Sequence, residues 1–159
     1  PSRCGRLGDA VEAACKEVGI DAVRGGTYLA MEGPQFSTLA ESNLYRSWGC
    51  DVIGMTNMPE AKLAREAEIC YATVAMVTDF DCWHPDHDHV TVEAIIKVLL
   101  ENAEKGRSLV KQVTPKFSGR TDTCAHGCHT ALEHALITAP EARDPDMIQK
   151  LSAVAGRVL

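Results

Sequence analysis

Two apolar runs separated by a helical pattern, all within residues 51–83, limit most strongly what this chain can fold into. Residues 52–55 are apolar, and residues 71–77 are apolar and rich in β-branched side chains, as is typical of a strand buried on both faces. Between these runs Pro59 and Glu60 begin the helical pattern, because proline suits a first turn and an acid suits the positive helix end. This succession predicts an α/β layered fold.

Further helices and one further strand are expected on either side of this unit. Thr38 and Glu41 have the spacing of a capping box, and Thr91 is suited to cap the longest helical pattern of the chain. Gly19 is expected to end the first helix, because glycine readily adopts the left-handed conformation found after helices. We therefore expect helices at residues 5–18, 39–48 and 92–113, a strand within residues 23–31, and helical segments near His129–Ile137 and Pro145–Val158.

The composition argues against two classes of partner. The chain has 159 residues, the size of one domain, and a net charge of −6. With this charge and without a basic cluster, we expect no nucleic-acid partner. No apolar run approaches the roughly 20 residues of a membrane span, and no signal-peptide pattern opens the chain. We therefore expect a cytoplasmic protein that does not associate with a membrane.

The seven cysteines are expected to be mostly structural. Most of them lie in apolar periodic segments, where a free cysteine behaves as a small hydrophobic residue. An odd number of cysteines without a secretion signal fits a reduced, intracellular protein. The seven cysteines are Cys4, Cys15, Cys50, Cys70, Cys82, Cys124 and Cys128.

The candidate functional residues follow the two apolar runs. Met55 and Thr56 lie between a strand end and a helix start, where free backbone N–H groups favour an anion. Asp79 and Asp81 follow the second run two residues apart, so in extended chain they point to the same side. Ligands of open α/β sheets bind beyond the carboxyl ends of strands, which makes this rim the predicted site. Taken alone, Thr56 is equally suited to cap a helix, a role that Asn57 can also fill. For the two aspartates taken alone, a solvated loop end is the favoured interpretation.

Two groups of potential metal ligands have simpler interpretations. Residues 84–89 alternate histidine and aspartate, which suits a polar loop as well as a metal site. A second group, around residues 124–134, contains a Cys-x-x-x-Cys spacing that departs from the tight spacing of zinc sites. A helix face with free thiols or a disulfide is the favoured interpretation of the second group, and no metal is expected. The second group consists of Cys124, His126, Cys128, His129 and His134.

Three stretches share their order and spacing with one enzyme family. They are EGPQFST at residues 32–38, GMTNMPEAKLAREAE at residues 54–68 and MVTDFDCW at residues 76–83. Together they resemble the carboxyl-terminal part of the trimeric purine nucleoside phosphorylase family, over residues 1–115. The resemblance implies a three-layer α/β fold, with a mixed central sheet flanked by helices, here without its amino-terminal half. Residues 116–159 are then a helical extension of unknown role.

The family phosphorolyses nucleosides, and three positions imply which nucleoside this chain takes. Where 6-oxopurine enzymes of the family carry Glu, Asn and His, the chain has Ser37, Asp79 and Val92. This combination resembles an adenine reader with an apolar pocket for a 5′-methylthio group. By the same resemblance, Phe36 stacks beside the base or sugar, Met55 packs the ribose, Thr56 binds phosphate, Thr78 lines the base pocket, and Ile96 joins Val92.

The chemistry of a carboxyl pair fits such a reaction. Burial and a neighbouring carboxylate each favour protonation of one aspartate. A proton on Asp79 would stabilise the purine more strongly in the transition state, where N7 gains charge, than in the ground state. Asp81 would then hold the geometry or share the proton. Val92 and Ile96 are core residues on any interpretation, and lining a methylthio pocket is an additional role.

The expected activity is therefore phosphorolysis of S-methyl-5′-thioadenosine to adenine and 5-methylthioribose 1-phosphate. Inorganic phosphate is the co-substrate, and no cofactor is expected. The family resemblance also implies a homo-oligomer, a trimer or higher, and the missing half requires a companion chain if the protein is to be active. One alternative is a purine nucleoside phosphorylase of other specificity. A second is a non-catalytic purine-binding or assembly fragment.

Overall fold

The computed structural model describes residues 4–85 and 91–159, which divide into two compact units. The first, called here the sheet unit, comprises residues 9–57 and 74–119. The second, the tail unit, contains the chain up to Gly8, residues 58–73 and residues 120–159. The expected division of the chain at residue 115 stays a prediction. In the structure, residues 120–159 group with segments from much earlier in the chain.

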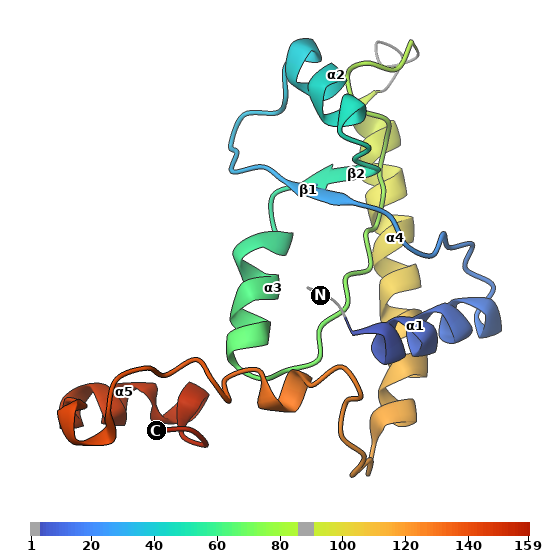
Figure 1. Ribbon diagram of the computed structural model, residues 1–159. Coiled ribbons are helices and arrows are strands. Elements are labelled where there is room, and N and C mark those ends of the chain that lie inside the picture. Colours follow the sequence, from blue (N-terminus) through green and yellow to red (C-terminus); the bar gives the residue numbers. More distant parts are fainter. Residues whose placement is uncertain (1–3, 86–90) are drawn as a thin grey trace. The chain divides into compact units, whose positions relative to one another are not determined.

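The sheet unit contains a two-stranded parallel sheet. Strand β1 (Tyr28–Ala30) pairs with β2 (Val52–Gly54), with Leu29 opposite Ile53 (Figure 1). Helix α2 (Leu39–Ser47) lies in the connection between them, as parallel strands require a crossover. Backbone hydrogen bonds extend the pairing at one end, where the Met31 N–H donates to the Gly54 carbonyl at 2.9 Å. The α/β character expected from the sequence is present, in a small sheet with helices.

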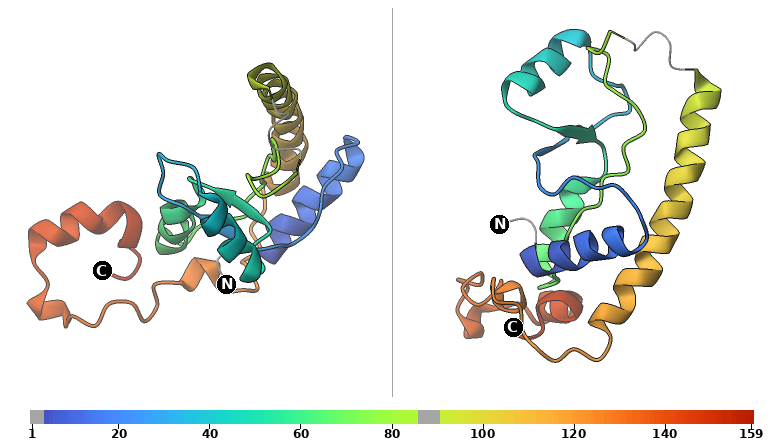
Figure 2. Two further views of the ribbon diagram at one scale, coloured as in Figure 1. Left: turned by 90° about the horizontal axis from the view of Figure 1, so that it is seen from above. Right: turned by 90° about the vertical axis from the view of Figure 1, so that its right-hand side faces the viewer.

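The two capping predictions are confirmed. At the start of α2 the Glu41 N–H donates to Thr38 Oγ1 at 3.3 Å, and the Thr38 N–H donates to the Glu41 carboxylate at 2.7 Å. Helix α4 (Val92–Val113) begins at Thr91, whose hydroxyl accepts from the Ala94 N–H at 3.2 Å. It is one continuous helix in both views of Figure 2 and ends in a 3₁₀ turn at Thr114–Phe117. Among the described residues, no helix has the length and apolarity needed to cross a membrane.

The core of the sheet unit joins α1 (Gly5–Glu17) to α4. Ala14 and Cys15 of α1 are buried at 0% and 3% exposure against Leu109 of α4. Glu17, at the end of α1, accepts a hydrogen bond from Gln112 and pairs with Lys116 at 2.7 Å. Helix α1 therefore packs on α4 through a small apolar contact, which is flanked by the polar contacts of Glu17.

Two strand predictions need correction. Residues 71–77 form no strand, and the strand expected within residues 23–31 is reduced to β1. A strand is stabilised by its neighbours, and β1 and β2 pair only with each other in the described chain. Val74 and Val77 are accordingly 41% and 59% exposed. The mixed central sheet of a three-layer fold remains an expectation.

The tail unit is built from short helices. Helix α3 (Asn57–Glu66) contains Met58 with extended backbone angles, so its regular turns begin at Pro59, as expected. Helix α5 (Pro145–Ala155) begins after Asp144, whose carboxylate accepts from two backbone N–H groups. The helix expected at residues 129–137 is wrong, because a 3₁₀ turn at Cys128–Thr130 is followed by further turns.

An ion-pair network connects two segments of the tail unit. Arg157 donates to both carboxylate oxygens of Glu68, at 2.6 and 2.8 Å, and pairs with Glu133 at 3.1 Å. The Leu132 N–H also donates to Glu68, at 3.0 Å. These hydrogen bonds, led by those from Arg157, lower the pKa of Glu68 from 4.5 to about 2. The network fixes the segment after α5 to the end of the α3 region.

Candidate active site

The candidate site is built around the loop at residues 78–84 of the sheet unit, here called the carboxylate loop. It follows the extended segment that ends at Val77, whose carbonyl accepts a hydrogen bond from the Asn102 side chain of α4 at 2.9 Å. Thr78 is half-buried, and its hydroxyl donates to the carboxylate of Asp79 at 2.6 Å. Asp79 itself is exposed. The burial that would favour a proton on this aspartate is therefore not provided by the described part of the chain.

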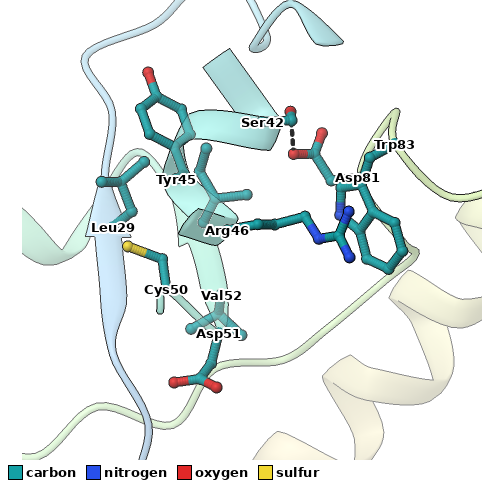
Figure 3. A pocket seen from close by; sticks show the side chains of 10 residues that line it. Leu29, Ser42, Tyr45, Arg46, Cys50, Asp51, Val52, Asp81 and Trp83 are labelled. Carbon is teal, nitrogen blue, oxygen red and sulfur yellow. Dashed lines mark hydrogen bonds between the residues drawn. The ribbon is translucent and has the colours of Figure 1, made fainter. Parts of the chain in front are cut away.

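Asp81 is held in place from two sides. The buried hydroxyl of Ser42, on α2, donates to Asp81 Oδ2 (Figure 3). From the other side, the Cys82 N–H donates to Asp81 Oδ1 at 2.8 Å. Ser42 is 1% exposed, and Asp81 is half-buried. The two carboxylates thus differ in kind: Asp81 is fixed by two donors on two oxygens, whereas Asp79 faces solvent.

Cys82 connects the carboxylate loop to the segment that carries Ser37. Its sulfur lies 3.3 Å from Ser42 Oγ and 3.6 Å from the Ser37 carbonyl oxygen. Ser37 is half-buried, and its hydroxyl points at the sulfur of Met31, 3.8 Å away. Phe36 is 81% exposed, so its aromatic ring, which is expected to stack on the substrate, is not buried in a core of the described chain.

A shallow hollow lies beside Asp81. Figure 3 shows Arg46 extending across it toward Trp83, and the Arg46 guanidinium lies 3.8 Å from the centre of the indole ring. The hollow has a volume of about 60 Å³ and is also lined by Ser42. Sites for drug-sized ligands usually measure about 300–1,000 Å³. The hollow is therefore too small to hold a whole nucleoside.

Met55 and Thr56 occupy the bend directly after β2, as expected. Met55 is half-buried, and a Cβ atom added at Gly33 would lie only 2.6 Å from its sulfur. The glycine, which has φ +69°, thus makes room for this methionine. Thr56 is exposed immediately before Asn57, where α3 begins. Its exposed hydroxyl is compatible with binding an anion.

Val92 and Ile96 are not core residues of the described chain. They are 67% and 49% exposed on the first turns of α4. The interpretation of both as core positions is therefore wrong, because the described residues leave this face of the helix uncovered. Their role in a methylthio pocket stays a prediction.

Sequence reasoning missed Ser42, Arg46 and Cys82 as parts of this site. Ser42 and Arg46 are four residues apart on α2 and hence on one helix face, a spacing that was readable in the sequence. Nothing in the sequence indicated that this face meets the carboxylate loop, 39 residues further along the chain.

The two groups of potential metal ligands have different outcomes. His84 stacks on Phe80 with ring centres 4.2 Å apart, and residues 86–90 lie outside the described part of the chain. Cys124 and Cys128 are not on a regular helix face, which corrects that interpretation, and all seven cysteines are free thiols. In the tail unit, the four sulfurs of Cys4, Cys70, Cys124 and Cys128 lie within 4.8 Å of one another, close enough to hold a metal ion.

Comparison with known proteins gives consistent matches over most of the chain. A sequence model described as "Phosphorylase superfamily" matches residues 1–115. A curated relative from Rhodospirillum rubrum, S-methyl-5'-thioadenosine phosphorylase, is 68% identical over 153 residues, which are 96% of this chain and 52% of the relative. A protein of the same name from Bradyrhizobium diazoefficiens is 64% identical over 97% of this chain and 53% of its own length. The chain spans about half the length of the curated relatives it matches.

Solved structures give the same match. A methylthioadenosine phosphorylase from an antarctic soil metagenomic library has a TM-score of 0.86 and 42% identity, covering 96% of this chain and 54% of that one. Methylthioadenosine phosphorylase from Schistosoma mansoni in complex with adenine has a TM-score of 0.70 and 25% identity, over 84% of this chain and 51% of that one. The similarity to the curated relatives and to the metagenomic structure extends past residue 115, into the segment that sequence reasoning left unassigned.

Proposed function

Because the chain belongs to the phosphorylase superfamily, we propose that it takes part in the phosphorolysis of S-methyl-5′-thioadenosine, yielding adenine and 5-methylthioribose 1-phosphate. The observation that carries this proposal is the 68% identity, over 96% of the chain, to a relative named for that substrate. The relatives have roughly as much chain again, so the activity is proposed for the protein in which this half is completed.

Asp79 and Asp81 divide the proposed chemistry between them. Asp79 is exposed and accepts from the Thr78 hydroxyl, so its carboxyl group is accessible to a purine. As the bond to the anomeric carbon breaks, N7 of the base gains negative charge, and a proton held between Asp79 and N7 stabilises that charge. Asp81 is a positioning residue, because Ser42 and the Cys82 N–H already engage both of its oxygens.

The remaining site residues supply binding. Thr56 offers an exposed hydroxyl beside a helix start for inorganic phosphate, and Met55 offers an apolar surface for the ribose. Val92 and Ile96 present uncovered apolar side chains, which suit the methylthio group since they leave no polar group unsatisfied. Such an apolar pocket discriminates only modestly against a hydroxyl group.

A completed site requires more protein than this chain offers. The hollow of about 60 Å³ is far smaller than a nucleoside site, and Phe36, Asp79 and Val92 are all exposed. These features support the proposal that a second half of the protein, or a neighbouring subunit of a homo-oligomer, covers this surface. Organisation as a trimer, a cytoplasmic location and independence from cofactors belong to the same proposal.

The main alternative is a purine nucleoside phosphorylase of other specificity. Ser37 and Asp79 are the positions that would decide it, because a 6-oxopurine presents a carbonyl where adenine presents an amine. We expect Ser37→Glu combined with Asp79→Asn to shift kcat/KM toward inosine. An unchanged preference for the adenine nucleoside in that double variant would refute this assignment of the base pocket. A non-catalytic purine-binding fragment is the second alternative.

The deciding experiment is adenine release from S-methyl-5′-thioadenosine by natively purified protein, with and without phosphate and with inosine for comparison. We expect release that requires phosphate and favours the methylthio nucleoside. Asp79→Asn should lower kcat/KM by a factor of roughly 10² to 10⁴, the usual contribution of general acid–base catalysis. Asp21→Asn, an exposed aspartate of the sheet unit, is the matched control. Adenine binding without release would favour the non-catalytic alternative.

A further inference from the structure

Four of the seven cysteines converge in the tail unit, although three separate segments of the chain carry them. The sulfur atoms of Cys4, Cys70, Cys124 and Cys128 all lie within 4.8 Å of one another. Three of the four residues are buried, with exposures of 2%, 5% and 7%, and Cys70 is half-buried.

The spacing of the sulfurs is close to that of a tetrathiolate metal site. A tetrahedral zinc ion has Zn–S distances of about 2.3 Å, which places the sulfurs roughly 3.8 Å apart. The sulfur of Cys124 lies 3.7 Å from that of Cys4 and 3.5 Å from that of Cys128. Closing the widest pair to the tetrahedral spacing requires a movement of about 1 Å. A disulfide bond, by contrast, requires about 2.05 Å between two sulfurs.

The backbone around the cluster is arranged to hold these positions. The Cys4 N–H donates to the Tyr71 carbonyl at 2.6 Å, which fixes the first ligand beside the segment that carries Cys70. Between the last two ligands, Gly127 adopts φ +64°, and its N–H donates to the Cys124 carbonyl at 3.0 Å. This turn brings both sulfurs to one side, despite a sequence spacing one residue longer than in the usual Cys-x-x-Cys pair.

The surroundings of the cluster are suited to a structural ion. Leu7 packs against it as a partly buried apolar neighbour. A Cβ atom at Gly5 would lie 3.2 Å from the Nε2 atom of His126, so the glycine allows that imidazole to approach the start of α1. Four thiolate ligands leave no open coordination position, which is the pattern of structural rather than catalytic zinc.

We propose that Cys4, Cys70, Cys124 and Cys128 form a tetrathiolate site for a soft divalent cation, with Zn²⁺ as the natural occupant. Thiolate ligands in tetrahedral geometry select this class of ion. Each thiol that coordinates the ion releases its proton to solvent. The ion would hold the beginning of the described chain against residues 70 and 124–128, and would thereby stabilise the tail unit. This proposal is independent of the proposed enzymatic function.

The first test uses the wild-type protein, purified natively without chelator, and therefore does not depend on a variant that folds. We expect elemental analysis by mass spectrometry to find one zinc per chain. Titration with an organomercurial thiol reagent should release that zinc to a colorimetric chelator, because the reagent blocks the ligands. Replacement by Co²⁺ should give the intense visible absorption of a tetrahedral thiolate complex.

Two variants locate the site. Cys70→Ser and Cys128→Ser each remove one ligand and should lower zinc content and abolish the tetrahedral Co²⁺ spectrum. Cys50→Ser, at a half-buried cysteine of the sheet unit, is the matched control and should keep one zinc per chain. Only trace metal in the wild-type protein, or two disulfides among the four cysteines in non-reducing peptide mapping, would overturn the proposal. Full zinc content in Cys70→Ser and Cys128→Ser would overturn it as well.

Discussion

Replacing Ser42 with alanine isolates the contact that fixes the candidate active site. Ser42 is 1% exposed, and the substitution removes the hydroxyl that donates to Asp81, with little change in side-chain volume. Hydrogen bonds to charged groups contribute roughly 1.5–3 kcal/mol. Asp81 is half-buried and keeps the 2.8 Å bond from the Cys82 N–H, so we take the lower part of that range, about 1.5–2 kcal/mol. With a urea m-value of about 1–3 kcal/mol per molar, the unfolding midpoint should fall by about 1 M.

The two tryptophans make the measurement specific. Trp48 and Trp83 are the only tryptophans of the chain, and both belong to the sheet unit, so tryptophan fluorescence in urea follows that unit. Ser47→Ala is the matched control, because Ser47 is exposed and its hydroxyl donates to the Leu44 carbonyl of the same helix. It should change the unfolding free energy by no more than about 0.5 kcal/mol. Equal midpoints for the variants at Ser42 and Ser47 would refute the assigned contact.

Two further predictions concern a glycine and a carboxylate. Gly33→Ala should lower the free energy of unfolding by more than Gly49→Ala. Both glycines have positive φ, which costs alanine about 1–2 kcal/mol. At Gly33 the new Cβ would also lie 2.6 Å from the Met55 sulfur, whereas at Gly49 it meets no atom within 4 Å. Equal losses in urea unfolding would contradict the close approach. Glu68, with its pKa lowered to about 2, contributes stability that is present above pH 4.5 and lost as the pH falls toward 2. NMR titration of its carboxyl group should give a midpoint near 2 that rises toward 4.5 in Arg157→Gln, and a wild-type midpoint near 4.5 would disprove the pairing.

Helix positions were largely predictable because their signals are local. Thr38 and Glu41 form the expected capping box within four residues of each other, and Thr91 caps α4 at the expected place. Gly19 ends α1 with φ +70°, the conformation that glycine adopts at little cost. In each case the residues that determine the boundary are neighbours in sequence, so no knowledge of tertiary structure was needed.

The strand and core predictions failed where they depended on distant partners. The apolar run at residues 71–77 has the composition of a buried strand, but composition indicates only that a segment would fit between neighbours. Val77 and Ile96 remain 59% and 49% exposed, because the described chain brings no neighbours over them. Relatives about twice as long are consistent with such surfaces being covered in the whole protein.

The candidate site was predictable in part. Thr78, Asp79 and Asp81 were identified from one continuous motif, whereas the contact between Ser42 and Asp81 joins residues 39 positions apart. The cysteine cluster could not be predicted for the same reason, because Cys4 and Cys124 are 120 residues apart. Sequence spacing carries information about ligands that share a turn, such as Cys124 and Cys128, but not about those that meet only after folding.

The interleaved composition of the two units has a consequence for synthesis. The segments of the sheet unit end at Gly119, so a growing polypeptide has all of them available before residues 120–159 are translated. The tail unit also contains residues 120–159, so it can assemble only after these residues have been translated. Until Cys124 and Cys128 have been translated, the thiols of Cys4 and Cys70 lack these two neighbours. In that interval the nascent polypeptide is most vulnerable to oxidation and to wrong thiol contacts.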